Sequence, residues 1–239
     1  MRKSTFMFTS WLMLSAVTLQ SDTVFAADAA ANIRADVANG QVIFNEGKGD
    51  ASACVGCHGE KGLGMDAMGA PRLANIGQVY IVKQLANFAN DLYVPSGMGA
   101  VMNGVGKALS DQDRRDVAAY LDSLEYEMDS SDLKALAADK IKVGKPEQGK
   151  ILVTKGIKGR VPACQDCHGF NGRAPHIPAL NQQKYTYLVN QLNNYRDGSR
   201  ASDPKVNKIG IMQGIAKKLS DENIVDIAAF LSTSPRITP

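Results

Sequence analysis

The chain has 239 residues, of which 44% are hydrophobic, 21% are charged and only 6% are aromatic, and its formal net charge is +3. This length accommodates one large domain or two small ones. The nearly balanced charge gives no reason to expect a nucleic-acid partner, and no stretch after residue 26 is apolar for long enough to cross a bilayer.

The first residues have the order of a secretory signal. Arg2 and Lys3 precede an apolar run that ends near Leu19, and a short polar stretch then leads to Ala26. The apolar run is shorter than the roughly 20 residues that a membrane span requires. We therefore expect residues 1–26 to be a signal peptide cleaved after Ala26, with the mature chain exported to the periplasm, soluble or peripherally associated with a membrane.

The remainder of the chain contains an internal repeat. Three pairs of segments match at offsets between 107 and 110: 40–47 with 149–156, 71–85 with 178–192, and 101–124 with 211–234. A copy of about 100 residues is a usual size for a small autonomous domain. We predict an N-terminal domain over 27–124 and a C-terminal domain over 144–239, joined by a polar linker over 125–143.

Each copy reads as mostly helical, because apolar residues recur at helical spacing and strand alternation is weak. A short amphipathic helix precedes the cysteines, a middle helix contains a tyrosine, and a last helix follows a serine suited to an N-cap. In chain order these are 33–46, Tyr80 and Ser110 in the first copy, and 147–155, Tyr187 and Ser220 in the second. The predicted fold class is all-α.

All four cysteines occur in pairs separated by two residues, and a histidine follows each pair. The two triplets are Cys54, Cys57 and His58, and Cys164, Cys167 and His168. A double zinc knuckle places its pairs roughly 15 to 20 residues apart, and a thioredoxin-like thiol pair needs a βαβ setting, which these helical copies do not provide. The pattern is instead the attachment signature of c-type haem. We predict two covalently bound haem c groups, each with an adjacent histidine as an iron ligand.

Two methionines are candidates for the opposite iron ligand. Met102 and Met212 occupy the same position in the repeat, each 44 residues beyond its histidine. Met–His ligation is typical of electron transfer. Met98 lies one helical turn from Met102 and stays open as the alternative in the first copy, while its repeat partner, Lys208, cannot serve. His176 could in principle bind iron, but a loop histidine is the favoured interpretation.

Pro71 and Pro178 match across the repeat, just beyond the attachment sites. Either they only stiffen a loop, or a backbone carbonyl of this loop fixes the ring of the neighbouring histidine. Tyr80 and Tyr187 either pack in the core or reach a haem propionate, and the core is the favoured interpretation.

The segments 161–200 and 211–232 of the second copy resemble the di-haem cytochromes c of the cytochrome c4 family, and the first copy resembles them more weakly. The resemblance implies a tandem duplication of two class I cytochrome c domains and a periplasmic carrier that delivers electrons to a terminal oxidase. It also implies two axial ligand pairs: His58 with Met102, and His168 with Met212.

The two halves differ in charge, with a net charge of −5 over 27–143 and +7 over 144–239. Such a dipolar carrier could be steered so that each haem meets a different partner. The predicted function is electron transfer between a redox protein donor and an acceptor such as a membrane-bound terminal oxidase, with no enzymatic activity. The alternative is a small di-haem oxidoreductase, or the haem subunit of a dehydrogenase that acts on a sulfur compound, which would need an open iron position.

Overall fold

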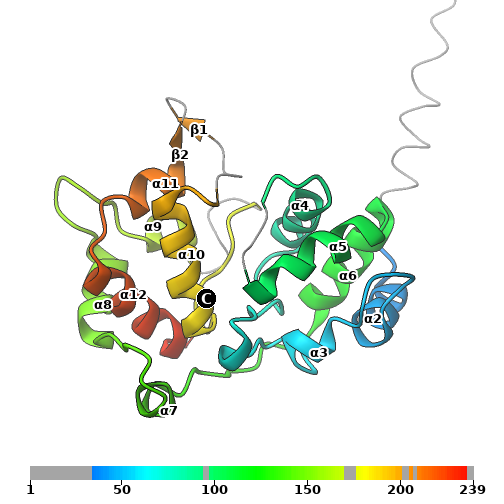
Figure 1. Ribbon diagram of the computed structural model, residues 1–239, viewed down its shortest axis with the longest axis horizontal. Coiled ribbons are helices and arrows are strands. Elements are labelled where there is room, and N and C mark those ends of the chain that lie inside the picture. The colour runs from blue at the N-terminus through cyan, green and yellow to red at the C-terminus, as the bar shows by residue number, and fades with distance from the viewer. Residues whose placement is uncertain (1–33, 94–96, 170–175, 201–204, 207–208, 236–239) are drawn as a thin grey trace, which may run out of the picture. The chain divides into compact units, whose positions relative to one another are not determined.

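The computed structural model describes residues 34–93, 97–169, 176–200, 205–206 and 209–235 (Figure 1). Residues 35–239 form one compact unit. The predicted signal peptide lies outside the described residues. Among the helices that are described, none combines the length and the apolar character needed to span a bilayer.

The described part of the chain is helical, as predicted, apart from one short hairpin. In the first half the helices are α2 (Val37–Glu46), α3 (Val55–His58), η1 (Asp66–Met68), α4 (Gln78–Ala89), η2 (Gly97–Ala100), α5 (Val101–Ala108) and α6 (Asp111–Ser123). In the rest they are α7 (Leu133–Ala138), α8 (Pro146–Lys155), α9 (Gln165–His168), α10 (Tyr185–Asp197), α11 (Ile211–Ala216) and α12 (Asp221–Thr233). The hairpin pairs β1 (Lys205–Val206) with β2 (Ile209–Gly210), antiparallel.

The two serines predicted as N-caps start α6 and α12. Ser110 Oγ accepts a hydrogen bond from the backbone N–H of Asp113, whose side chain accepts one from the N–H of Ser110. Ser220 and Asn223 form the same reciprocal pair. Each capping box satisfies two backbone N–H groups that the helix itself leaves unpaired. The first helix begins later than predicted, at Val37, because the Asp36 carboxylate caps it by accepting from two N–H groups.

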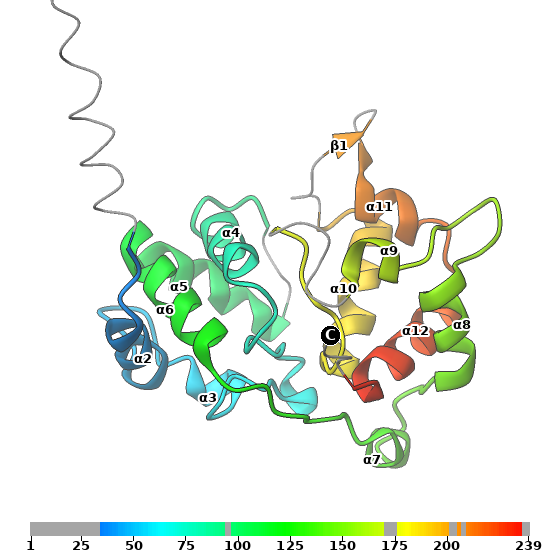
Figure 2. The same cartoon turned by 180° about the vertical axis from the view of Figure 1, so that it is seen from behind.

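In each half the first and last long helices pack closely together: α2 on α6, and α8 on α12 (Figures 1 and 2). A glycine lies at each crossing, and a Cβ added at Gly40 or Gly149 would overlap the backbone carbonyl of Asp116 or Asp226. Because these residues match across the repeat, the same close approach of backbones is built twice.

Replacing Gly149 by alanine is therefore expected to destabilise the second half by about 1–3 kcal/mol, the usual cost of overpacking. Gly104 in α5 is the matched control, since its added Cβ would meet nothing within 4 Å. Gly104→Ala should leave the free energy of unfolding unchanged or raise it slightly. Denaturant unfolding of the haem-loaded protein, followed by circular dichroism, measures both, and equal stabilities for the two variants would contradict the close crossing.

Each half has its own apolar core, and each core borders one cysteine pair. In the first half the rings of Phe44 and Tyr120 pack with centroids 5.6 Å apart and tilted by 48°, and Cys54 and Met102 pack against this core. In the second half Cys164 packs against a core built around α12. The segment proposed as the linker contributes Leu136 of α7 to that second core. Each core therefore packs against one predicted haem attachment site.

Candidate functional site

A large cavity of about 710 Å³, with a mostly apolar lining, is bordered by residues of both halves. The residues predicted as haem attachment points and iron ligands all line it: Cys54, Cys57, His58, Met102, Cys164, Cys167, His168 and Met212. The structure thus gathers two sets of equivalent residues, 110 positions apart in the sequence, around one space.

A single helical turn arranges each cysteine pair with its histidine. The Cys54 carbonyl accepts hydrogen bonds from the N–H groups of Cys57 and His58, at 3.2 and 2.9 Å, and the Cys164 carbonyl makes the equivalent bonds. None of the four cysteines forms a disulfide. Burial raises the pKa of Cys54 and Cys164 to about 11. A redox-active cysteine pair needs a reactive thiolate, which the burial of Cys54 and Cys164 disfavours.

Backbone carbonyls hold both histidine rings. Nδ1 of His58 lies 2.9 Å from the Pro71 oxygen, and Nδ1 of His168 lies 2.9 Å from the Pro178 oxygen. A carbonyl only accepts, so each Nδ1 carries the hydrogen and the lone pair of the neutral ring is on Nε2. Burial lowers the pKa of His58, which is 6% exposed, and so favours the neutral ring. Of the two roles left open for the proline loops, the structure shows the one in which a backbone carbonyl fixes the histidine ring.

The two predicted methionine ligands have equivalent places. Met102 is the second residue of α5 and Met212 the second residue of α11, and both are half-buried and line the cavity. The backbone of Met98 lies in η2, while its side chain lies outside the described residues. His176 is exposed and also borders the cavity.

A buried arginine that the sequence analysis did not identify also lines the cavity. Arg200 is 3% exposed and donates hydrogen bonds to Tyr80 Oη, at 2.8 Å, and to Gln191 Oε1. Its guanidinium lies over the rings of Tyr93 and Tyr195, 5.1 and 4.7 Å from their centroids. Within the described part of the chain no carboxylate pairs with it, and its buried Nε has no hydrogen-bond partner. No pattern in the sequence marks Arg200, because it has no counterpart in the repeat: the first half contains no arginine between α4 and α5.

The loops that hold the two histidines are hydrogen-bonded to each other. The Gln183 side chain, 3% exposed, accepts from the N–H of Arg72 at 2.6 Å and donates to the Arg72 carbonyl at 3.0 Å. The N–H of Ala179 donates to the Ile76 carbonyl at 3.2 Å. These residues follow Pro71 and Pro178 closely, so each half helps to fix the other half's histidine loop.

The sequence matches the cytochrome c family twice, over residues 37–125 and 147–235. A thiosulfate dehydrogenase electron acceptor from Stutzerimonas stutzeri is 33% identical over 206 residues, which are 84% of this chain and 88% of the relative. A cytochrome c4 from Pseudomonas aeruginosa is 33% identical over 191 residues, covering 77% of this chain and 85% of that protein.

Solved structures agree with these relatives. Reduced cytochrome c4 from Pseudomonas stutzeri superposes with a TM-score of 0.65 and 30% identity, over 83% of this chain and 98% of that one. Thiosulfate dehydrogenase from Marichromatium purpuratum gives a TM-score of 0.70 and 26% identity, over 83% of this chain but only 40% of the larger one. Each of the two family matches contains one cysteine pair, which indicates two covalently bound haem c groups. By these similarities the chain belongs to the cytochrome c family and, within it, to the di-haem cytochromes c4.

Proposed function

We propose that this di-haem electron carrier works in the periplasm, accepts electrons from a respiratory donor and delivers them to an acceptor such as a terminal oxidase, without enzymatic activity of its own. One observation carries the proposal: each half brings a cysteine pair, a carbonyl-held histidine and a methionine to the same cavity. An iron held by a histidine and a methionine has no vacant position for a substrate.

The residues that line the cavity fit a haem. We propose attachment through Cys54 and Cys57 in the first half and through Cys164 and Cys167 in the second. The residues that would bind the two irons are His58 with Met102, and His168 with Met212. The buried guanidinium of Arg200, which has an unpaired Nε, fits a group that carries carboxylates, as the propionates of haem do. When bound, each haem supplies a one-electron iron couple.

Residues of the chain set the reduction potential of that couple and limit its contact with water. The Pro71 and Pro178 carbonyls accept from the histidine Nδ1–H groups, which fixes the ring orientation and makes Nε2 a stronger donor. The thioethers of Met102 and Met212 favour the reduced state and so raise the reduction potential. The apolar lining limits the access of water, which would otherwise stabilise the oxidised state.

The relatives suggest the class of donor. A second relative, from Thiomonas intermedia, is also named a thiosulfate dehydrogenase electron acceptor, and it is 32% identical over 190 residues. We propose a dehydrogenase that oxidises thiosulfate or a related sulfur oxyanion as the donor. The same similarity supports the alternative in which this chain is a haem subunit of such an enzyme.

We expect the dithionite-reduced protein to keep its spectrum when carbon monoxide is added at neutral pH, because both irons already have two protein ligands. The measurement is the Soret band before and after addition. Prompt binding to either haem would favour the oxidoreductase and count against the carrier.

A second arm of the experiment tests the donor. Thiosulfate alone should leave the oxidised protein unchanged, whereas thiosulfate with purified thiosulfate dehydrogenase should reduce both haems. Reduction by thiosulfate alone would show that this chain performs the chemistry itself. No reduction in either mixture would exclude this class of donor.

A further inference from the structure

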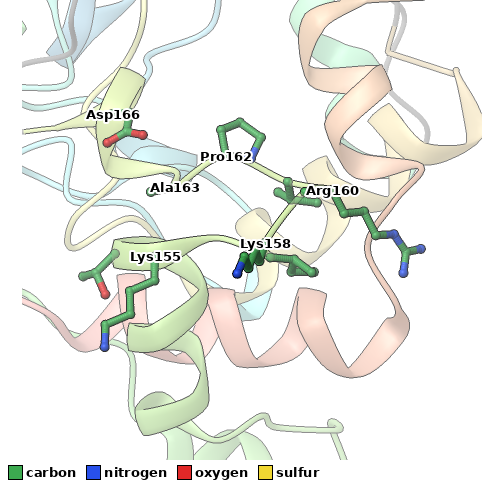
Figure 3. Close-up of a pocket in the computed structure, with 10 residues that line it drawn as sticks. Lys155, Lys158, Arg160, Pro162, Ala163 and Asp166 are labelled. Carbon is green, nitrogen blue, oxygen red and sulfur yellow. The ribbon is translucent and has the colours of Figure 1, made fainter.

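A basic loop lies beside the second cysteine pair. We define the basic loop as residues 155–160, which contain Lys155, Lys158 and Arg160, all exposed. These side chains border an open hollow on the surface, and Figure 3 shows Lys155 at the end of α8 with Lys158 and Arg160 on the turn that follows. The basic loop starts with the last residue of α8 and leads through Val161, Pro162 and Ala163 to Cys164.

The charges of the basic loop are not neutralised within the described part of the chain. None of the three basic side chains forms an ion pair there. One carboxylate, Asp166, borders the same hollow, and in the view of Figure 3 it lies beyond Ala163 from the two lysines. Three cations and one carboxylate leave a net charge of +2 that faces solvent.

The equivalent loop of the first half has the opposite character. Glu46 matches Lys155, Lys48 matches Lys158, and Asp50 matches Arg160, so the net charge is −1. Lys48 is moreover paired with the buried carboxylate of Asp113. The fold therefore does not require a basic loop at this place, because the first half connects its helix to its cysteine pair through a turn that is one residue shorter and not basic.

The hollow adjoins the cavity that we assign to haem. Val161, Pro162 and Ala163 line both the hollow and the cavity. A protein that docked over the basic loop would therefore lie close to the second haem, and electron transfer between proteins is fast only when the two redox centres approach closely.

We propose that the basic loop is the docking surface for an acidic electron-transfer protein, which exchanges electrons with the second haem. This proposal rests on the proposed carrier function. Each productive encounter would move one electron, so that one protein is oxidised and the other is reduced. Unpaired charges at the edge of a protein–protein interface act chiefly by steering the two proteins toward each other, which raises the association rate.

A protein partner fits the loop better than a membrane surface does. Binding at an anionic bilayer usually combines basic residues with apolar side chains that enter the interface. The apolar residues here are not available for that purpose: Ile157 of the basic loop packs against the second core, and Val161, just after the loop, is 5% exposed.

The test exchanges the loop charges for those of the first half. The double variant K155E/R160D of the haem-loaded protein introduces the residue types that the first half has at the equivalent positions, Glu46 and Asp50. The matched control is K134E/K140D, which changes the net charge equally at two exposed lysines in and just after α7. The probe is a synthetic octaglutamate peptide, titrated into the ¹⁵N-labelled, reduced proteins at low ionic strength and followed by NMR.

We expect the peptide to shift amide signals of 155–166 and not those of 46–56. The dissociation constant should rise about tenfold or more in K155E/R160D, and by less than about twofold in the control. Shifts elsewhere, or equal affinity for all three proteins, would overturn the proposal. Binding to phosphatidylserine vesicles without binding to octaglutamate would overturn it in favour of a membrane surface. Carbon monoxide binding by the wild type would instead refute the carrier function while leaving the docking result standing.

Discussion

Replacing Met212 by alanine should open the second haem to carbon monoxide and lower its reduction potential by on the order of 0.1 V or more. The structure places Met212 at the start of α11, half-buried and bordering the cavity with His168. Alanine has no atom that can reach an iron, so water or an added ligand would take the position. Axial-ligand identity sets haem potentials over a range of about 0.8 V, and methionine lies at its high end. Spectroscopic redox titration and carbon monoxide difference spectra measure the two effects.

The control for this variant is Met128→Ala, because Met128 is 59% exposed and is not one of the residues that line the cavity. It should change neither readout. The same two measurements identify the methionine that binds the first haem iron: Met102→Ala should open this iron to carbon monoxide, and Met98→Ala should not. If Met212→Ala retained the wild-type potential and stayed inert to carbon monoxide, the assignment of that ligand would be wrong.

Features that depend on short stretches of sequence were predictable. The haem attachment motif is contained in five residues, and one helical turn shapes it in both halves. The serine N-caps act on N–H groups three positions away, so Ser110 and Ser220 could be assigned without knowledge of the fold. The repeat then supplied a comparison, since Met102 and Met212 stood out by sharing a position.

Features that depend on distant partners were not predictable. Arg200 bonds to Tyr80 across 120 positions, and Gln183 bonds to Arg72 across 111. Neither pair leaves a local pattern, and neither is duplicated, because the contacts between the two halves use different residues on each side. The segment 125–143 was predicted as a linker, yet Leu136 of α7 is buried in the second core. Its short apolar pattern was too weak to separate a packed turn of helix from a loop.

The two halves agree in the residues that bind haem and differ in the charge of their surface loops. Both halves use the same cysteine, histidine and proline geometry. The surface loops before the cysteines both close with an antiparallel bridge, but they differ in length by one residue and carry opposite charge. A duplicated carrier that keeps its cofactor sites and varies its surface can receive electrons at one haem and release them at the other.

Replacing Arg200 by methionine is expected to lower both the stability and the haem potentials. The change leaves Tyr80 Oη and Gln191 Oε1 without their donor and, in our proposal, a haem carboxylate without its cation. An uncompensated buried charge costs about 3–5 kcal/mol. The oxidised iron carries one more positive charge than the reduced iron, so loss of a nearby cation stabilises the oxidised state. One unit charge at an effective dielectric of about 20 shifts a potential by roughly several tens of millivolts.

Two further variants separate the electrostatic role of Arg200 from a purely structural one. Arg200→Lys keeps the charge but not the planar fork, so it should restore most of the potential and only part of the stability. Arg196→Met removes the same charge near the end of α10, where the arginine pairs with the exposed Asp221, and it should cost at most about 1 kcal/mol. Unfolding curves and redox titrations of the three proteins give both quantities. If Arg200→Met lost stability while both potentials stayed at their wild-type values, Arg200 would be a packing residue and another group would have to neutralise the haem carboxylates.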